Sequence, residues 1–290
     1  MDDPVYDPVT EDITVSNDSK RACIQHLSIE SHGDRMLGVL FRAQGEGPHP
    51  TAIILHGFPG HDRNLDIAHT LRRGGVNSVV FHYRGTWGSD GQFSFSNMLD
   101  DTVAAIEYLR KNNRELSVDK DKIILVGHSM GGWSALMTAI EDGDISCVVN
   151  FAGFNLGALK EWVLSKEANM DMARKTIKGL SQSVNAPTID SLMDEVLQNG
   201  DDWNLLRHPL KLSKKSLLLI WAKNDQLSLP VMHFHPMYES LFSAGASDLA
   251  THMIDSDHSF SDGRIELQHT IWNWLKKTLM NCCSQQIMKI

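Results

Sequence analysis

The feature that most constrains this chain is a serine between two glycines, at a point where a buried strand is expected to turn into a helix. Residues 123–126 form a continuous apolar run rich in β-branched side chains, which is typical of a buried strand. Gly127, Ser129 and Gly131 follow, and a helix-forming segment comes next. This arrangement is the nucleophile-elbow pattern G-x-S-x-G. A side chain at either glycine would collide with the neighbouring strand or helix, and the strained turn would expose the serine at the C-terminal edge of a sheet.

The rest of the chain alternates between expected strands and helices. An N-terminal hairpin at 22–30 and 35–43 precedes six further strands, expected at 51–56, 76–83, 123–126, 145–151, 216–222 and 250–254. Outside residues 154–212 and the elbow helix, helices are expected at 62–73 with Asp62 as cap, 96–112 with Ser96 as cap, 231–244 and 262–280. This alternation predicts an α/β fold, with a mostly parallel eight-stranded sheet, helices on both faces and an antiparallel N-terminal edge.

Residues 154–212 depart from the alternation, because only helical segments are expected there, at 156–166, 172–183 and 188–198. We interpret this stretch as an inserted helical cap of the domain. Its position between two strands places it above their C-terminal ends, and breaks at residues 185–187 and 199–200 suit a lid that can move. We expect an acidic, flexible leader at 1–21, the folded domain at 22–280 and a polar tail at 281–290.

Charge and composition exclude several classes of function. The net charge of −9 argues against a surface for nucleic acid or anionic membranes, although six of the acids precede the first lysine. No apolar run approaches the roughly 18 residues of a membrane span. The leader lacks the basic start and apolar stretch of a signal peptide, so we expect a cytoplasmic protein. The four cysteines form no C-x-x-C pair, and Cys282 and Cys283 are interpreted as an exposed incidental pair, with palmitoylation or redox chemistry as the alternative.

A serine hydroxyl near neutral pH needs a base, and the base needs a group that orients it. In a sheet of this kind the partners are expected after the serine, acid before histidine, just beyond strand C-terminal ends. Asp225 follows strand 216–222 and His258 follows strand 250–254. Asp225 could instead be a turn former or helix cap. Asp202 in the cap is a weaker substitute, and Asp255 and Asp257 are too close in sequence to His258.

Fourteen histidines make chance matches easy, but only His258 lies in the loop after the final strand. His208 and His269 lack that placement. His233 and His235 could suggest a metal site, yet no third ligand follows at motif spacing, so we expect no metal.

A site for the developing oxyanion is expected after strand 51–56, at His56-Gly57-Phe58. Backbone N–H groups at this edge can point at the developing charge. We expect the amides of Phe58 and Met130 to form the oxyanion hole. His56 itself is expected to brace the loop by hydrogen bonding and not to transfer protons.

Taken together, these residues resemble the α/β-hydrolase superfamily. The resemblance covers roughly residues 22–280 apart from the cap, and rests on His56-Gly57-Phe58, Gly127-His-Ser-Met-Gly131, Asp225 and His258 in the family's order. The loops at 83–91 and 257–260 look like those of its esterase and serine-aminopeptidase-like branches. The resemblance implies an α/β-hydrolase fold, Ser129 as nucleophile, His258 as base, Asp225 as its orienter, and no cofactor.

The leading hypothesis is hydrolysis of a small carboxylic ester through an acyl-enzyme. The cap carries apolar residues that could line an acyl pocket, about half of which we expect only to pack the cap on the core: Leu156, Leu159, Trp162, Val163, Met170 and Met172. Among them we single out Trp162 as substrate-binding. The alternatives are a peptidase or amidase, in which Glu161 and Glu167 hold an amino terminus, and a non-catalytic binding protein on the same scaffold.

Overall fold

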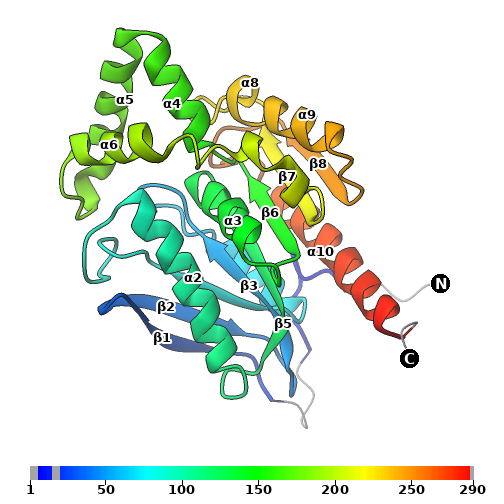
Figure 1. Ribbon diagram of the computed structural model, residues 1–290. Coiled ribbons are helices and arrows are strands. Elements are labelled where there is room, and N and C mark those ends of the chain that lie inside the picture. Colours follow the sequence, from blue (N-terminus) through cyan, green and yellow to red (C-terminus); the bar gives the residue numbers. More distant parts are fainter. Residues whose placement is uncertain (1–5, 15–19, 288–290) are drawn as a thin grey trace.

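The computed structural model describes residues 6–14 and 20–287, the last seven of them as backbone only. Within these residues, eight strands form one sheet in the order β1-β2-β4-β3-β5-β6-β7-β8 (Figure 1). β1 and β2 form an antiparallel hairpin, β2 is antiparallel to β4, and all other neighbours are parallel. The predicted fold class is therefore confirmed. The strands are β1 (Cys23–Ser31), β2 (Asp34–Arg42), β3 (His49–Leu55), β4 (Asn77–Phe81), β5 (Val118–His128), β6 (Cys147–Phe151), β7 (Ser216–Ala222) and β8 (Leu249–Ile254).

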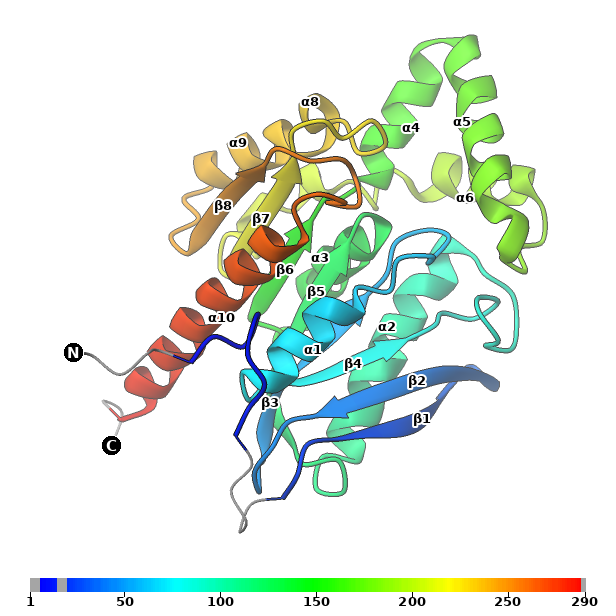
Figure 2. The same cartoon turned by 180° about the vertical axis from the view of Figure 1, so that it is seen from behind.

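Helices cover both faces of the sheet. On one face lie α2 (Phe95–Lys111), α3 (Met130–Glu141) and α9 (His235–Ser243), and on the other lie α1 (Leu65–Arg73) and α10 (Arg264–Ile287) (Figures 1 and 2). Alternate residues of a central strand enter opposite cores: Ile53 and Leu55 belong to the first, Ala52 and Ile54 to the second. Both faces of the strand are therefore buried from solvent, which explains its unbroken apolar sequence.

Several predicted helix ends differ from the structure. Ser94, not Ser96, caps α2, since its Oγ accepts the Asn97 amide at 3.0 Å. Asp62 does not cap α1: it accepts the Asn64 amide, and the helix begins after Asn64. The helix predicted at 231–244 is two helices, α8 (Pro230–His233) and α9, because Pro236 has no amide to continue the first.

The two chain ends also differ from the prediction. Part of the predicted flexible leader is packed: the Pro8 carbonyl accepts a hydrogen bond from Arg73 Nε at 2.6 Å, and Val9 is buried. The rest of that prediction, at residues 1–5 and 15–19, lies outside the described residues. At the other end α10 continues to Ile287, so residues 282 and 283 belong to its backbone and not to a tail beyond it.

The segment predicted to be a cap, residues 154–212, lies at the C-terminal ends of the parallel strands, and we call it the cap below (Figure 1). It contains α4 (Leu156–Ser165), α5 (Glu167–Leu180), α6 (Ile189–Asn199) and α7 (Pro209–Leu212), with short turns at 181–183 and 205–207. Two contacts fix its base. The Asn185 amide donates to the Gly85 carbonyl at 2.7 Å, and the Glu195 carboxylate accepts the Phe95 amide at 2.8 Å, at the start of α2. Among the residues described, no helix has both the length and the apolar character needed to cross a membrane.

Candidate active site

Ser129 lies on the sharp turn between β5 and α3, with φ of 55° and ψ of −120°. This left-handed conformation is costly for a residue with a side chain. Four backbone hydrogen bonds hold it in place: the Ser129 amide donates to the Phe151 carbonyl at 3.0 Å, and the Ser129 carbonyl accepts from the amides of Gly132, Phe154 and Trp133 at 2.9, 3.1 and 3.3 Å. The strained turn thus has a fixed position at the sheet edge.

The glycines on either side of Ser129 are required by space, as predicted. A Cβ on Gly131 would lie 2.1 Å from the Leu55 carbonyl oxygen, and a Cβ on Gly127 would lie 2.3 Å from the Gly131 oxygen. Neither contact is possible without moving the backbone. The elbow sequence therefore allows α3 to pack directly against β3 and β5.

Asp225 and His258 meet across the ends of β7 and β8. His258 Nδ1 lies 2.8 Å from Asp225 Oδ2. Because a carboxylate accepts, Nδ1 donates, which leaves Nε2 unprotonated in the neutral ring and able to take a proton. Asp225 Oδ1 accepts the amides of Leu227 and Ser228 at 2.8 and 2.7 Å. Burial alone would raise the pKa of Asp225, but His258 and these two amides hold that pKa below its usual value.

The residue before the nucleophile, His128, has a role that the sequence analysis did not predict. Its Nε2 lies 2.9 Å from the His258 carbonyl oxygen and must donate, since that oxygen only accepts. The ring also stacks on Phe151, with centroids 5.0 Å apart. Burial and the neighbouring His258 lower the pKa of His128 to about 4, so the ring is neutral near pH 7. His128 thereby ties the His258 loop to the elbow.

The residues expected to bind an oxyanion flank Ser129. A Cβ on Gly57 would lie 2.9 Å from Ser129 Cβ, so the loop after β3 passes directly beside the serine. In the described part of the chain, no acceptor binds the amide of Phe58 or of Met130. His56 donates from Nδ1 to the Gly57 carbonyl at 2.7 Å, and burial lowers the pKa of His56 to about 3. It braces this loop as predicted and stays neutral near pH 7.

Ser129 and His258 open into one cavity of about 230 Å³ between the cap and the strand ends. The lining is mostly apolar, with Ser129, Thr176, Gln226 and His258 as its polar members. It includes residues of the loop after β3, the elbow, α2, α4, α5 and the 226–232 segment. Of the six cap residues proposed for an acyl pocket, Leu159, Trp162 and Met172 line this cavity. Leu156 and Val163 are buried in the core instead.

The alternative acids have other partners. Asp255 binds Lys223 and Asn224 at 2.8 Å each, and the Asp257 carboxylate accepts the amides of Ser259 and Ser261. Asp202 is exposed in the cap. Among these candidates, the structure brings only Asp225 to His258.

The pair His233 and His235 does not form a metal site. The Asn155 amide donates to His233 Nδ1 at 3.1 Å, while the exposed His235 packs against Trp221. In the described residues no three His, Cys, Asp or Glu side chains come together in a way that could hold a metal ion.

Comparison with known proteins identifies the family and the fold. The model of the alpha/beta hydrolase family matches residues 52–264, which include the elbow, both strand-end loops and the cap. The chain belongs to this family. One curated relative of this alpha/beta hydrolase is the quorum-quenching protein AidA of Acinetobacter baumannii, 28% identical over 137 residues, 45% of this chain and 44% of AidA. Another is the uncharacterized protein YfhR of Salmonella typhimurium, 34% identical over 87 residues, 30% of this chain and 29% of YfhR. The matches thus span less than half the length of these relatives.

Solved structures of other proteins share the fold of this alpha/beta hydrolase. The Pyrococcus furiosus esterase Pf2001 aligns with a TM-score of 0.64 and 17% identity, over 88% of this chain and 91% of the esterase. Est1E from Butyrivibrio proteoclasticus aligns with a TM-score of 0.62 and 16% identity, over 88% and 99%. The acylaminoacyl peptidase of Pyrococcus horikoshii aligns with a TM-score of 0.66 and 15% identity, over 89% of this chain and 41% of the peptidase.

Proposed function

We propose that this α/β hydrolase cleaves small carboxylic esters through an acyl-enzyme. Ser129 is the nucleophile, His258 the base and Asp225 the group that orients the base. The observation that carries the proposal is the 2.8 Å contact between His258 and Asp225, with His258 and Ser129 lining the same apolar cavity. A serine nucleophile needs both a base and a group that fixes the tautomer of that base.

The chemistry balances with these three residues. Ser129 Oγ attacks the ester carbonyl carbon while His258 Nε2 takes its proton. The tetrahedral intermediate then collapses, and His258 gives the proton to the departing alcohol oxygen. Water attacks the acyl-enzyme in the second half, with His258 again taking a proton and returning it to Ser129. Asp225 stays ionised throughout and stabilises the imidazolium.

The amides of Phe58 and Met130 form the oxyanion hole in this proposal. Both belong to turns beside Ser129, and neither has an acceptor among the described residues. Donors that are already in place need no reorganisation when charge develops, so each is expected to contribute a few kcal/mol to the transition state. The start of α3 adds its favourable dipole at the same point.

The acyl group is held in the 230 Å³ cavity under the cap. Its walls include Phe58, Leu159, Trp162 and Met172, and the only titratable side chain among the lining residues is His258. An apolar acyl chain would displace water there without leaving a charged group unpaired. Trp162 is the substrate-binding residue of the proposal.

The second candidate is a peptidase that binds the free amino terminus of its substrate. The two glutamates proposed to bind that terminus do not line the cavity. Glu161 accepts a hydrogen bond from Asn204 Nδ2 at 3.0 Å, and neither Glu161 nor Glu167 lines the cavity. Because an acylaminoacyl peptidase shares this fold, the experiment below also includes substrates with amide bonds.

The discriminating experiment compares p-nitrophenyl esters of increasing chain length with aminoacyl-nitroanilides. We expect ester turnover with a chain-length optimum and little or no cleavage of the anilides. Faster cleavage of the anilides would favour the amidase. Absence of turnover together with no labelling by a fluorophosphonate would favour a non-catalytic binding protein.

A further inference from the structure

The cavity under the cap has lining residues of two kinds. Phe95 of α2, Leu159 of α4 and Ile177 of α5 are buried, at 0%, 8% and 8% exposed. Leu227 and Leu229 line the same cavity but are 48% and 40% exposed. A lining side chain that other residues cover belongs to the closed end of a cavity, and one that also meets solvent belongs to its rim. The cavity therefore has a closed end beside α2, α4 and α5 and an open end at residues 227 and 229.

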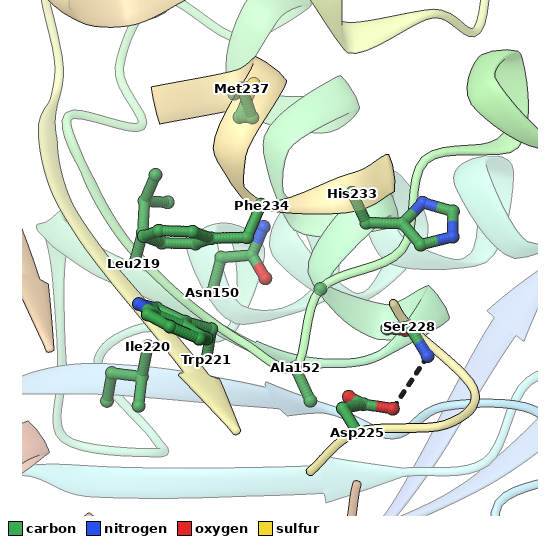
Figure 3. Close-up of a pocket in the computed structure, with 11 residues that line it drawn as sticks. Asn150, Ala152, Leu219, Ile220, Trp221, Asp225, Ser228, His233, Phe234 and Met237 are labelled. Atoms are coloured by element: carbon green, nitrogen blue, oxygen red, sulfur yellow. Dashed lines mark hydrogen bonds between the residues drawn. The ribbon is translucent and has the colours of Figure 1, made fainter. Parts of the chain in front are cut away.

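Leu227 and Leu229 belong to the loop that carries Asp225, the proposed acid. Asp225 Oδ1 accepts the amide of Ser228 at 2.7 Å (Figure 3) and the amide of Leu227 at 2.8 Å. Ser228, which lies between the two exposed leucines in the sequence, is buried. Because Asp225 also binds His258 at 2.8 Å, the hydrogen bonds that orient the acid also fix the two leucines relative to the base.

The order of the strands places the base and the Phe58 amide on opposite sides of Ser129. Ser129 follows β5, and the loop with Phe58 follows β3, its neighbour on one side. Asp225 and His258 follow β7 and β8, which lie beyond β6 on the other side. The segment 226–232 leads from β7 into α8 on this second side, whereas α5 lies on the side of α2 (Figures 1 and 2). The open end of the cavity is therefore the end nearer the base.

This asymmetry assigns the two halves of an ester. In the proposed reaction the carbonyl oxygen lies at the amides of Phe58 and Met130, and His258 gives its proton to the alcohol oxygen. The alcohol must then lie on the His258 side, where residues of the 226–232 segment form the wall. The acyl chain is left with the closed end, beside α2 and α4.

The open end is apolar and carries no charge. The lining of the cavity includes no Asp, Glu, Lys or Arg, and its exposed polar side chains, Thr176 and Gln226, are neutral. Met172 of α5 is a further exposed apolar lining residue, at 58%. Exposed apolar side chains grouped at a cavity mark a ligand-binding surface, and a charged group held there would lose water without gaining a partner. The open end therefore suits an apolar alcohol, and solvent beyond it sets no fixed limit on the length of that alcohol.

We propose that Leu227 and Leu229 form the binding surface for the alcohol half of the ester, and that the substrates are esters of apolar, uncharged alcohols. The alcohol lies along these two side chains at the open end, while the acyl chain fills the closed end. The inference rests on the proposed function, because the direction of the ester follows from the roles of Ser129, His258 and the oxyanion hole.

The test varies the alcohol at a constant acyl group, with ethyl, butyl and hexyl butyrate and with release of acid followed in a pH-stat. All three esters form the same butyryl-enzyme, so differences in kcat/KM between them report acylation, in which the alcohol is still bound. Straight-chain alcohols leave with nearly equal ease, which confines the comparison to binding. We expect kcat/KM of the wild type to rise about tenfold from ethyl to hexyl butyrate, because each added methylene group is partly buried on the leucines.

Leu229→Gln nearly keeps the size of the side chain and removes its apolar surface. We expect this variant to lower the hexyl-to-ethyl ratio of kcat/KM about threefold, with the preferred acyl chain length of p-nitrophenyl esters unchanged. Leu227→Gln should act in the same way, because the substitution retains the backbone amide that binds Asp225. This second variant decides the question if Leu229→Gln does not fold.

Two control variants separate the open end from its surroundings. Val231→Gln alters a residue of the same segment that is 75% exposed and does not line the cavity, so the hexyl-to-ethyl ratio should stay unchanged. Trp162→Ala alters the proposed acyl wall, so it should move the preferred acyl chain length and leave the hexyl-to-ethyl ratio unchanged.

Equal kcat/KM of the wild type for ethyl and hexyl butyrate would overturn the inference, and so would a ratio that neither leucine variant lowers. Leucine variants that move the preferred acyl chain length instead would also overturn it, because the two halves of the ester would then lie the other way round. Absence of turnover with every ester, or turnover that survives Ser129→Ala, would contradict the proposed function itself, so the two failures are distinguishable.

Discussion

The side chain of His128 donates a hydrogen bond from Nε2 to the backbone carbonyl of His258, at 2.9 Å. The residue before the proposed nucleophile therefore holds the loop that carries the proposed base. Their rings lie 4.9 Å apart between centroids, so the contact is one of packing as well as hydrogen bonding. Any shift of the elbow would move the loop of His258 with it, which keeps the spacing of Ser129 and His258 constant.

Replacement of Ser129 separates activity from stability. Ser129→Ala and Ser129→Gly should both lose on the order of 10⁴- to 10⁶-fold in ester turnover. Because residue 129 has φ of 55°, the glycine variant should be more stable than the alanine variant by about 1–2 kcal/mol. Urea unfolding measures the difference. More than a tenth of the wild-type activity in either variant would exclude Ser129 as nucleophile.

The acid is tested by two matched substitutions. Asp225→Asn should lower kcat about 10⁴-fold with little change in KM, since the amide favours the wrong tautomer of His258. Asp202→Asn, in the exposed part of the cap, should leave kcat within about twofold. Steady-state kinetics on one ester decides between them. The opposite ranking would place the acid in the cap.

The selectivity of the cap is tested at Trp162, which lines the cavity. Trp162→Ala should shift the preferred ester to a longer acyl chain, because it enlarges the apolar space, while the rate of labelling by a small fluorophosphonate changes little. Leu164→Ala on the same helix is the control, since Leu164 is 63% exposed and does not line the cavity. A flat chain-length profile, or loss of labelling, would reduce Trp162 to a packing role.

Because the pKa values of several largely buried histidines are low, we expect the free energy of unfolding to fall in mild acid. Burial lowers the pKa of His56 to about 3, and the pKa values of His82, His128 and His233 to about 4. Their stabilising effect is complete above the unfolded value of about 6.5 and is lost as pH falls toward 4, because only the unfolded chain then binds protons.

Urea unfolding at pH 7, 6 and 5 measures this loss, on the order of 1 kcal/mol per pH unit for each histidine. His82→Gln, which removes one of the four groups, should have a shallower dependence than the wild type. Equal stability of the wild type at pH 7 and pH 5 would contradict the assignment of neutral buried rings.

Much of the fold could be predicted because the strands are uninterrupted apolar runs and the turns carry glycine. The ends of the helices were harder to predict. Ser94 and Ser96 are both good caps two residues apart, and only the Asn97 amide, 3.0 Å from Ser94 Oγ, distinguishes them. Pro236 stands where α8 ends and α9 begins, and the prediction of a single helix at 231–244 did not take this proline into account.

The candidate site was predictable where chemistry and chain order coincide, at Ser129, Asp225 and His258, though their catalytic roles stay proposals. The hydrogen bonds of His128 and His233 were not predicted, because their partners lie far along the chain: His128 binds the carbonyl of residue 258, and His233 binds the amide of Asn155. Neither contact leaves a local sequence pattern. The packing of part of the acidic leader was not predictable either, because its partners, such as Arg73 for the Pro8 carbonyl and His269 for Asp7, also lie far along the chain.

The most direct test of the central claim is the site of covalent labelling. Native protein is treated with a fluorophosphonate, with and without a competing p-nitrophenyl ester, and the peptide from Ile123 to Lys160 is sequenced by tandem mass spectrometry. The account predicts one adduct per chain, on Ser129, that is reduced by the ester and absent from heat-denatured protein. No adduct, or an adduct on Ser134 or Ser146 in the same peptide, would contradict it.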